Sequence, residues 1–497
     1  MPKNFLFLII LFTIAFDDIH SYIVLPLKLL PKENYKSDNE LNSPKDIMTR
    51  EFFSTFYTEL EIGTPTQKIP MLVKQKQNDY VVTSANPMSN PTRDYSKRDV
   101  YNFSPNFLEK YKFYNELEST SISSATCKKR KPYDDDIEEP LAEQMCDSTE
   151  EITLYDNVNL NKVTEKNFHF DLVRNIKDNV PGIIGLALTD EYHQVSFLNT
   201  LKNNKLINNN YWFFETEKWD SETGKVIFGA FPHEVYEDKY ALEDYAYTKN
   251  EGSSNFYWEI AFDIITTGDQ QFSGESVELN LESNLNIGGK EYNKYFSSKI
   301  EGLVNDKVCF SDTFKGYDEY MEFFSDYTFY YCKNDEDTKA KLDEFLKTIS
   351  FYSKALNYYF ELSKEQLLKE NGDYIYINIV FANHIDRWKL GKQIALKYKF
   401  VFNPETKVIG FYNKTNGDKK DEGKDGQEQG KGEGSGDDSG SGSNVLLIVI
   451  IIVIVIVVIV VAIVLVKVFM SKKDNSTEMK DSQYYDNNKD TRIVNDN

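Results

Sequence analysis

Apolar and polar residues alternate over short distances through most of this chain. Between residues 22 and 412, runs rich in Val, Ile, Tyr and Phe are separated by Gly, Asn and Asp, as in FYWEIAFDIIT at 256–266 and DYIYINIVF at 373–381. Short runs of this composition, bounded by turn-forming residues, predict β-strands. Few segments show helical spacing, among them SFLNTLKNNKLI at 196–207. The pattern therefore predicts a mostly β fold with a few short helices.

Two longer apolar runs stand near the two ends of the sequence. Lys3 is followed by an apolar run over residues 5–16, which has the layout of a secretory signal peptide and is too short to span a bilayer. We therefore expect residues 1–21 to be removed. The second run, at residues 445–466, is uncharged and long enough for a transmembrane helix of about 20 residues.

The flanks of the second run predict its orientation. Lys467, Lys472 and Lys473 follow it, whereas the preceding flank is acidic, so residues 467–497 are expected to form a cytoplasmic tail. Residues 415–444 are Gly, Ser and charged residues without an apolar period, which predicts a flexible stalk. The sequence thus predicts a single-pass type I membrane protein. Its ectodomain is expected outside the cell or in the lumen of the secretory or endolysosomal system.

The net charge of the chain argues against one class of binding partner, nucleic acid. The 497 residues carry a formal net charge of -22. Nucleic acid is not expected as a partner, because phosphate binding needs clustered cations. The acidity favours a soluble ectodomain, which we expect to be a monomer.

Four cysteines form two pairs that are close in sequence, Cys127 with Cys146 and Cys309 with Cys332. In an oxidising compartment this spacing predicts two local disulfides, one in each half of the ectodomain. Spacing alone leaves the connectivity open.

Modification and cofactor signals are few. Sequons at Asn102 and Asn413 predict N-glycans, although Pro105 weakens the first. The five histidines lack metal-ligand spacing and none stands near a cysteine pair, so we expect no metal and no cofactor. Neither a Gly-x-Ser-x-Gly elbow nor a Gly-rich phosphate loop is present.

The order of six motifs is more specific than the composition. They are IGTPTQ (62–67), PGIIGLAL (181–188), SFLNTLKNNKLI (196–207), GKVIFGAF (224–231), YWEIAFDIIT (257–266) and WKLGKQIALKYKFVFNPETKVIGFY (388–412). In this order they resemble the pepsin-like aspartic proteases, a family of eukaryotic aspartyl proteases, over most of the ectodomain. The resemblance implies a bilobal, mostly β ectodomain over residues 22–414, with an N-terminal lobe at about 50–240 and a C-terminal lobe at about 250–412.

The same resemblance implies where the catalytic residues should stand. In this family two aspartates, one per lobe, share a proton, so that one acts as a base on water while the other donates to the scissile carbonyl. Each begins an Asp-Thr/Ser-Gly loop, whose Thr or Ser hydrogen-bonds across the lobes. Counting without gaps places the first aspartate at Lys74 and the second at Asn280. The cleft loops then continue as Gln75, Lys76 and Gln77, and as Leu281, Glu282 and Ser283. Both aspartates and both loop glycines are replaced.

These replacements favour a membrane-anchored pseudoprotease, inactive as an endopeptidase, that binds an extended peptide or a protein through strand-like pairing. One alternative is an active aspartic endopeptidase that uses a relocated carboxylate, Asp79 or Glu282. A second alternative is a structural surface protein with a collapsed cleft. In an open cleft, Lys74 and Lys76 would make the floor cationic, and an acidic peptide would be the first ligand to test.

Overall fold

The computed structural model describes twelve stretches of the chain. They are residues 22–30, 43–77, 80–86, 113–131, 134–140, 151–161, 163–173, 181–188, 196–218, 221–252, 257–318 and 323–412. Contacts divide the chain into two units, Met1–Lys424 and Asp425–Asn497, and every described residue belongs to the first.

Several expectations therefore lie outside the described residues and stay predictions. They are the signal peptide (1–21), the stalk (415–444), the apolar run (445–466), the tail (467–497), both sequons, Asp79 and Cys146. Among the described residues, no helix has both the length and the apolarity needed to cross a bilayer.

One large sheet runs through the N-terminal half and includes the last strands of the chain. Its order within the described residues is β12-β27-β26-β10-β11-β1-β2-β3-β9-β4-β8-β7-β5-β6. The strands are β1 (Ile23–Leu29), β2 (Phe56–Ile62), β3 (Gln67–Lys74), β4 (Tyr80–Thr83), β5 (Ser124–Lys131), β6 (Asp134–Pro140), β7 (Glu151–Leu160), β8 (Val163–Val173), β9 (Gly182–Gly185), β10 (Trp212–Thr216), β11 (Thr223–Phe228), β12 (Tyr245–Lys249), β26 (Val401–Asn403) and β27 (Val408–Tyr412). The strand period of two is clear in β1, where Ile23, Leu25 and Leu27 are buried while Pro26 and Lys28 are exposed.

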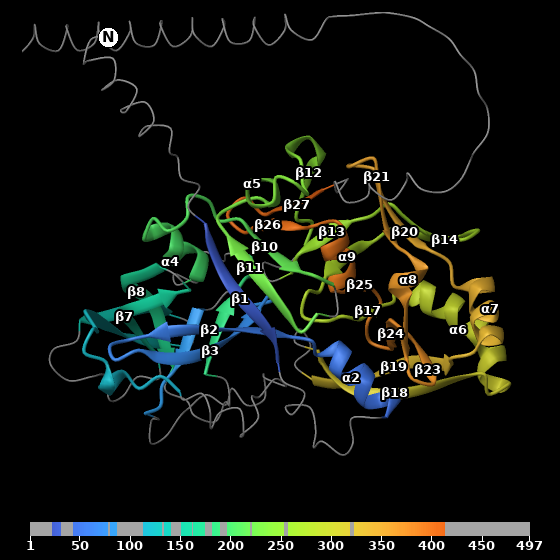
Figure 1. Cartoon of the computed structure of the whole chain (residues 1–497), viewed down its shortest axis with the longest axis horizontal. Coiled ribbons are helices and arrows are strands. Elements are labelled where there is room, and N and C mark those ends of the chain that lie inside the picture. The colour runs from blue at the N-terminus through green and yellow to red at the C-terminus, as the bar shows by residue number, and fades with distance from the viewer. Residues whose placement is uncertain are drawn as a thin grey trace, which may run out of the picture. The chain divides into compact units, whose positions relative to one another are not determined.

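Two further sheets build the C-terminal half (Figure 1). The larger has the order β13-β16-β25-β17-β24-β19-β23-β22, with β18 paired to β19, and the smaller has the order β15-β14-β20-β21. Their strands are β13 (Glu259–Ala261), β14 (Ile264–Thr267), β15 (Gln270–Ser273), β16 (Ser276–Leu279), β17 (Asn286–Ile287), β18 (Cys309–Asp318), β19 (Phe323–Lys333), β20 (Ile349–Ser353), β21 (Tyr358–Leu362), β22 (Leu368–Asn371), β23 (Tyr374–Ile377), β24 (Ile379–Ala382) and β25 (Lys389–Leu390).

Helices are short and few among the described residues, and the prediction of a mostly β fold is confirmed. The α-helices are α2 (Pro44–Phe52), α4 (Phe197–Asn203), α5 (Pro232–Val235), α6 (Lys290–Asn305), α7 (Glu336–Phe345), α8 (Lys364–Leu367) and α9 (Lys392–Lys397). Two 3₁₀ turns, η3 (Glu116–Glu118) and η4 (Leu242–Asp244), complete the set.

The two halves repeat one arrangement of strands, which agrees with a bilobal fold. In the first half, β3 runs parallel to β9 and β4 runs parallel to β8, while β4 and β9 are antiparallel. In the second half, β16 runs parallel to β25 and β17 runs parallel to β24, while β17 and β25 are antiparallel. The end of β3 is therefore the topological counterpart of the end of β16.

Helix α2 ties the two halves together. It begins after Ser43, whose side chain accepts a hydrogen bond from the backbone N–H of Asp46, and has Pro44 in its first turn. Although it precedes β2 in sequence, its residue Phe52 packs in the second half, with ring centroids 5.1 Å from Phe314 and 4.5 Å from Tyr327. Figure 1 shows α2 beside β18.

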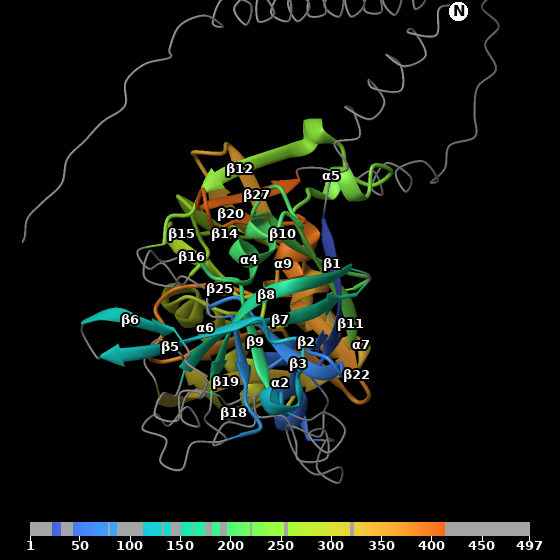
Figure 2. The same cartoon turned by 90° about the vertical axis from the view of Figure 1, so that its left-hand side faces the viewer.

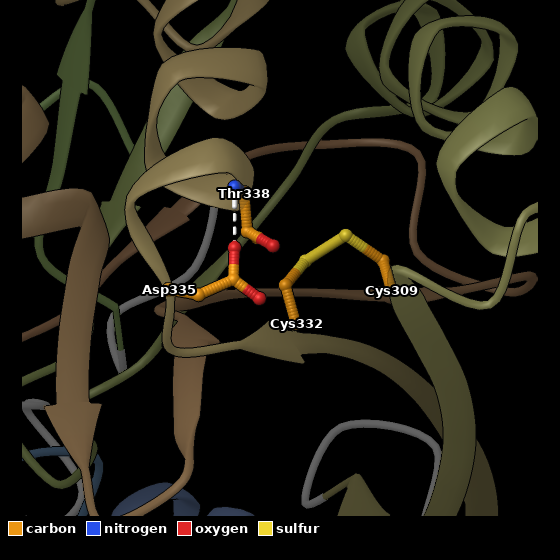
Figure 3. The surroundings of a disulfide bond; sticks show 4 residues. All are labelled: Cys309, Cys332, Asp335 and Thr338. Carbon is orange, nitrogen blue, oxygen red and sulfur yellow. Dashed lines mark hydrogen bonds between the residues drawn. A yellow bond between two sulfur atoms is a disulfide. The ribbon is translucent and has the colours of Figure 1, made fainter.

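The expected disulfide between Cys309 and Cys332 is confirmed. These residues lie directly opposite each other on β18 and β19, and the bond joins the two strands (Figure 3). Just beyond it, the side chain of Asp335 accepts a 2.8 Å hydrogen bond from the backbone N–H of Thr338 and caps α7. The expected bond between Cys127 and Cys146 involves residues or side chains outside the described part.

Candidate functional site

The two loops expected to carry the family's aspartates meet between the repeated strand sets. Lys74 is the last residue of β3, and its carbonyl accepts a 2.8 Å hydrogen bond from the backbone N–H of Leu186. Asn280 directly follows β16, and its backbone N–H donates to the carbonyl of Leu390 at 2.7 Å. Both side chains are buried.

A buried ion pair joins the two loops. The Nζ of Lys74 lies 3.2 Å from Oε2 of Glu282, and the two side chains are 1% and 6% exposed. The other carboxylate oxygen, Oε1, accepts hydrogen bonds from the backbone N–H groups of Gln75 at 2.7 Å and Lys76 at 3.3 Å. A carboxylate taken out of water needs several donors to offset its lost hydration. Glu282, at a position where the resemblance implies glycine, thus supplies the carboxylate at this junction.

The loop after β3 in the first half also contacts the loop after β16 in the second half. Oε1 of Gln75 accepts a 2.7 Å hydrogen bond from the backbone N–H of Leu281. The Oδ1 of Asn280 stays within its own loop, where it accepts from the backbone N–H of Glu282 at 3.3 Å. Gln75 therefore makes the kind of cross-lobe hydrogen bond that the resemblance assigns to Thr or Ser.

The remaining loop residues make mainly backbone contacts. The carbonyl of Gln77 accepts from the N–H of Ala187 at 2.9 Å, and the carbonyl of Ser283 accepts from the N–H of Lys392 at 2.9 Å. The Ser283 hydroxyl accepts a 3.0 Å hydrogen bond from the N–H of Leu285. These bonds fix the two loops to the segment after β9 and to the start of α9.

A second group of charges surrounds Glu278. Its carboxylate lies 2.9 Å from Nζ of Lys76 and 3.1 Å from Nζ of Lys389. Burial alone would raise the pKa of Glu278, but Lys389 and Lys76 outweigh it and hold the pKa below its usual value. Lys74 and Lys76 each contact a glutamate, so the positive charge expected from these two lysines is at least partly balanced at the junction.

A third contact of this kind involves the end of α2. Oε2 of Glu51 accepts a 2.7 Å hydrogen bond from Nδ2 of Asn284, and Oε1 lies 3.1 Å from Nζ of Lys369. Burial would raise the pKa of Glu51, but Lys369, the amide of Asn284 and Arg50 together lower it. Glu51 is therefore an ionised side chain that bridges the two halves.

Lys392 is a further buried charge at this junction, and it was not among the site residues predicted from the sequence. Its Nζ donates to the carbonyl of Ser54, lies 3.1 Å from the Ser54 hydroxyl and stands 4.2 Å from the ring centroid of Phe56. Burial lowers the pKa of Lys392 to about 7, against the smaller opposing effects of Glu51 and Glu282. The available signal was WKLGK at 388–392, the start of the last of the six motifs, where the resemblance implies the residues WILGD and therefore an aspartate at position 392.

The chemistry open to this arrangement differs from that of two aspartates. At the loops, Lys74 supplies an ammonium group and Asn280 supplies an amide, while the Glu282 carboxylate already accepts from three donors. A shared proton between two carboxyl groups is not available from these side chains. The described residues also hold no cluster of three His, Cys, Asp or Glu side chains placed to bind a metal ion.

Comparison with known proteins gives one positive finding. No curated protein matches this chain. The family model described as eukaryotic aspartyl protease matches residues 55–414, which span most of the 497 residues and include both loops. The chain therefore belongs to the eukaryotic aspartyl protease family.

Proposed function

We propose that this protein is a membrane-anchored pseudoprotease, which keeps the aspartyl protease fold without hydrolysing peptides and acts as a peptide- or protein-binding surface protein. The observation that carries the proposal is the buried pair of Lys74 and Glu282, 3.2 Å apart, between the two loops that the family uses for catalysis.

The loss of activity follows from the protonation chemistry. An amide at Asn280 cannot act as a carboxylic base, and an ammonium at Lys74 donates hydrogen bonds without accepting them. Loss of each proton-transfer role costs about 10²–10⁴ in rate. An Asp-Ser-Gly triplet does occur at residues 438–440, but it lies beyond the matched residues 55–414.

The test is an assay of the full chain on an acid-unfolded protein between pH 3 and pH 7. We expect no cleavage above background, with an active pepsin-like protease as the positive control. Turnover that disappears in Glu282→Gln or Asp79→Asn but persists in Lys74→Met would contradict the proposal and favour the relocated carboxylate.

Binding is supported by the cross-lobe contacts. Glu282 bonds to the first loop, Gln75 bonds to the second, and Glu51 bonds to Asn284, so that the two halves are held in a defined relation without a ligand. A scaffold ordered in advance loses less entropy when it binds. Because Lys74 and Lys76 contact glutamates, we expect no general preference for acidic peptides.

The burial of Lys74 and Glu282 also favours the second candidate, a structural surface protein with a collapsed cleft. Thermal shift of the full chain with a mixed library of extended peptides separates the two. A peptide that raises the melting temperature and contacts residues flanking the loops, found by crosslinking, supports binding. A library that leaves the melting temperature unchanged supports the structural role.

A further inference from the structure

An aromatic cluster surrounds Tyr245 on β12. The ring centroid of Tyr245 lies 5.1 Å from Phe231, 6.3 Å from Tyr247 and 5.5 Å from Tyr412. Phe231 in turn lies 4.1 Å from Tyr211. Figures 1 and 2 both show β12, β27 and α5 together at one end of the sheets.

The outer part of this cluster faces solvent. We define the tyrosine face as Tyr22, Tyr211, Phe231, Tyr236, Tyr245 and Tyr247, all of which are partly or largely exposed. Tyr247 is 63% exposed and Tyr22 is 40% exposed, and Leu242, on the turn just before β12, is 63% exposed. Tyr211, Phe231, Tyr236 and Tyr245 pack against the same buried cluster, and Tyr22 directly precedes Ile23, which pairs with Phe228 on β11.

Tyrosine suits one kind of surface in particular. Its ring is apolar while its hydroxyl remains hydrated, so tyrosines concentrate where apolar and aqueous phases meet, as at the surface of a bilayer. A patch of several such rings on a protein surface marks an interaction site more often than single exposed rings do.

The position of the C-terminal end of the described residues indicates that a membrane is the partner of this face. Tyr412 belongs to the cluster and is the last described residue, and 32 residues (413–444) separate it from the apolar run at 445–466. If these residues form the flexible stalk that their composition predicts, they would have a root-mean-square span of about 30 Å. If residues 445–466 cross a bilayer, the tyrosine face lies at the tethered end of the ectodomain.

We propose that the tyrosine face rests on the lipid head-group region of the membrane, with Leu242 and Tyr247 inserting most deeply. This inference rests on the membrane anchoring included in the proposed function. The exposed charges around the face have both signs: Glu237, Asp238 and Glu243 against Lys239 and Lys249. Since recognition of anionic lipid uses clusters of four or more cations, this face fits zwitterionic lipid.

The experiment uses the full chain in phosphatidylcholine liposomes. The stalk is cleaved at its lysines by limited proteolysis, and flotation measures how much ectodomain stays with the lipid. We expect a retained fraction that is insensitive to salt and is not increased by phosphatidylserine. The variant Leu242→Ser/Tyr247→Ser should reduce lipid affinity about tenfold or more. The matched control Leu117→Ser/Val163→Ser alters two hydrophobic residues that are 66% and 37% exposed elsewhere, and should leave retention unchanged.

The outcomes distinguish failure of the tyrosine-face proposal from failure of the membrane anchoring. If the uncleaved chain resists carbonate extraction but the cleaved wild-type ectodomain is released completely, only the tyrosine-face proposal is overturned. Extraction of the uncleaved chain by carbonate overturns the anchoring, and with it this inference. The tyrosine-face proposal is also overturned if Leu242→Ser/Tyr247→Ser and Leu117→Ser/Val163→Ser reduce lipid retention equally. It is overturned as well if retention depends on self-association of the ectodomain.

Discussion

At the residue scale, Lys74 and Asn280 stand where the resemblance implies two aspartates, and Glu282 stands where it implies a glycine, so the stability of the junction depends on a different pair of charges. Two aspartates can share one proton, whereas an ammonium and a carboxylate each depend on the other's charge once they leave water. Their separation of 3.2 Å and low exposure make this pair part of the folded core. Lys74 and Glu282 therefore add a charged contact between distant loops, at the positions where the resemblance implies an aspartate and a glycine.

Removal of one partner should be much more harmful than removal of both. We expect Glu282→Ala to lower the free energy of unfolding by about 3–5 kcal/mol, because Lys74 loses its buried carboxylate. The double variant Lys74→Met/Glu282→Gln should lose less, since neither charge of the pair remains and the Gln side-chain oxygen can still accept from the N–H groups of Gln75 and Lys76. Denaturant unfolding measures both. A double variant as unstable as the single one would contradict this account of the junction.

Lys392 should give the protein a distinctive pH dependence. Its pKa is about 7 in the folded chain and about 10.4 when unfolded, so between these values the unfolded state holds one more proton. The free energy of unfolding then rises with pH by up to about 1.4 kcal/mol per unit from this group, and below pH 7 the contribution stops changing. We expect Lys392→Met to flatten the slope between pH 7 and pH 9 in urea unfolding.

The control for this experiment is Lys294→Met on α6, which changes an exposed lysine. It should keep the wild-type slope. An unchanged slope in Lys392→Met would show that Lys392 is not the group responsible.

At the element scale, the two halves are joined by segments as well as by side-chain pairs. Strand β10 pairs with β26 through Trp212 and Phe402, so the last strands complete the sheet that begins in the first half. Helix α2 crosses in the opposite direction and packs its Phe52 against β18 and β19. Each half thus covers apolar surface that the other would expose.

Loss of the Phe52 ring should detach α2 from the second half. We expect Phe52→Ala to cost about 3–5 kcal/mol, as for other large buried aromatic residues. The milder Ser43→Ala removes only the N-cap of α2 and should cost about 1 kcal/mol. Hydrogen exchange over 44–52 reports the detachment directly. Equal protection of this helix in Phe52→Ala and the wild type would mean that the ring does not hold α2 in place.

Disulfide mapping tests the remaining cysteine pair. Peptide mass analysis without reduction should link Cys309 to Cys332, as observed between β18 and β19, and Cys127 to Cys146. The second link is expected because these residues are close in sequence. A bond between Cys127 and Cys309, or between Cys146 and Cys332, would contradict the assignment of one disulfide to each half.

At the scale of the whole molecule, the prediction concerns topology. In sealed vesicles the ectodomain should resist added protease while an epitope placed after Lys467 is lost, because the lysines that follow residues 445–466 stay in the cytoplasm. An Asn413→Gln variant should lose one glycan from the protected fragment. Protection of the tail with digestion of the ectodomain would reverse the topology.

Local patterns in the sequence determined the class of the fold and the positions of the two loops. The alternation of apolar residues is a local property of each strand, and the six motifs keep a spacing from which Lys74 and Asn280 can be counted. The Cys309–Cys332 pair could be predicted for the same reason, because its members are only 23 residues apart.

Only the tertiary structure decided which charges meet. Lys74 and Glu282 are 208 positions apart, and the end of β3 contacts the loop after β16 only because both halves repeat the same strand arrangement. The burial of Lys392, and its contact with Ser54 338 positions away, arises in the same way. The sequence around a charged residue does not show which distant residue it will contact. That distant residue decides whether two lysines form a cationic floor or lie within buried ion pairs.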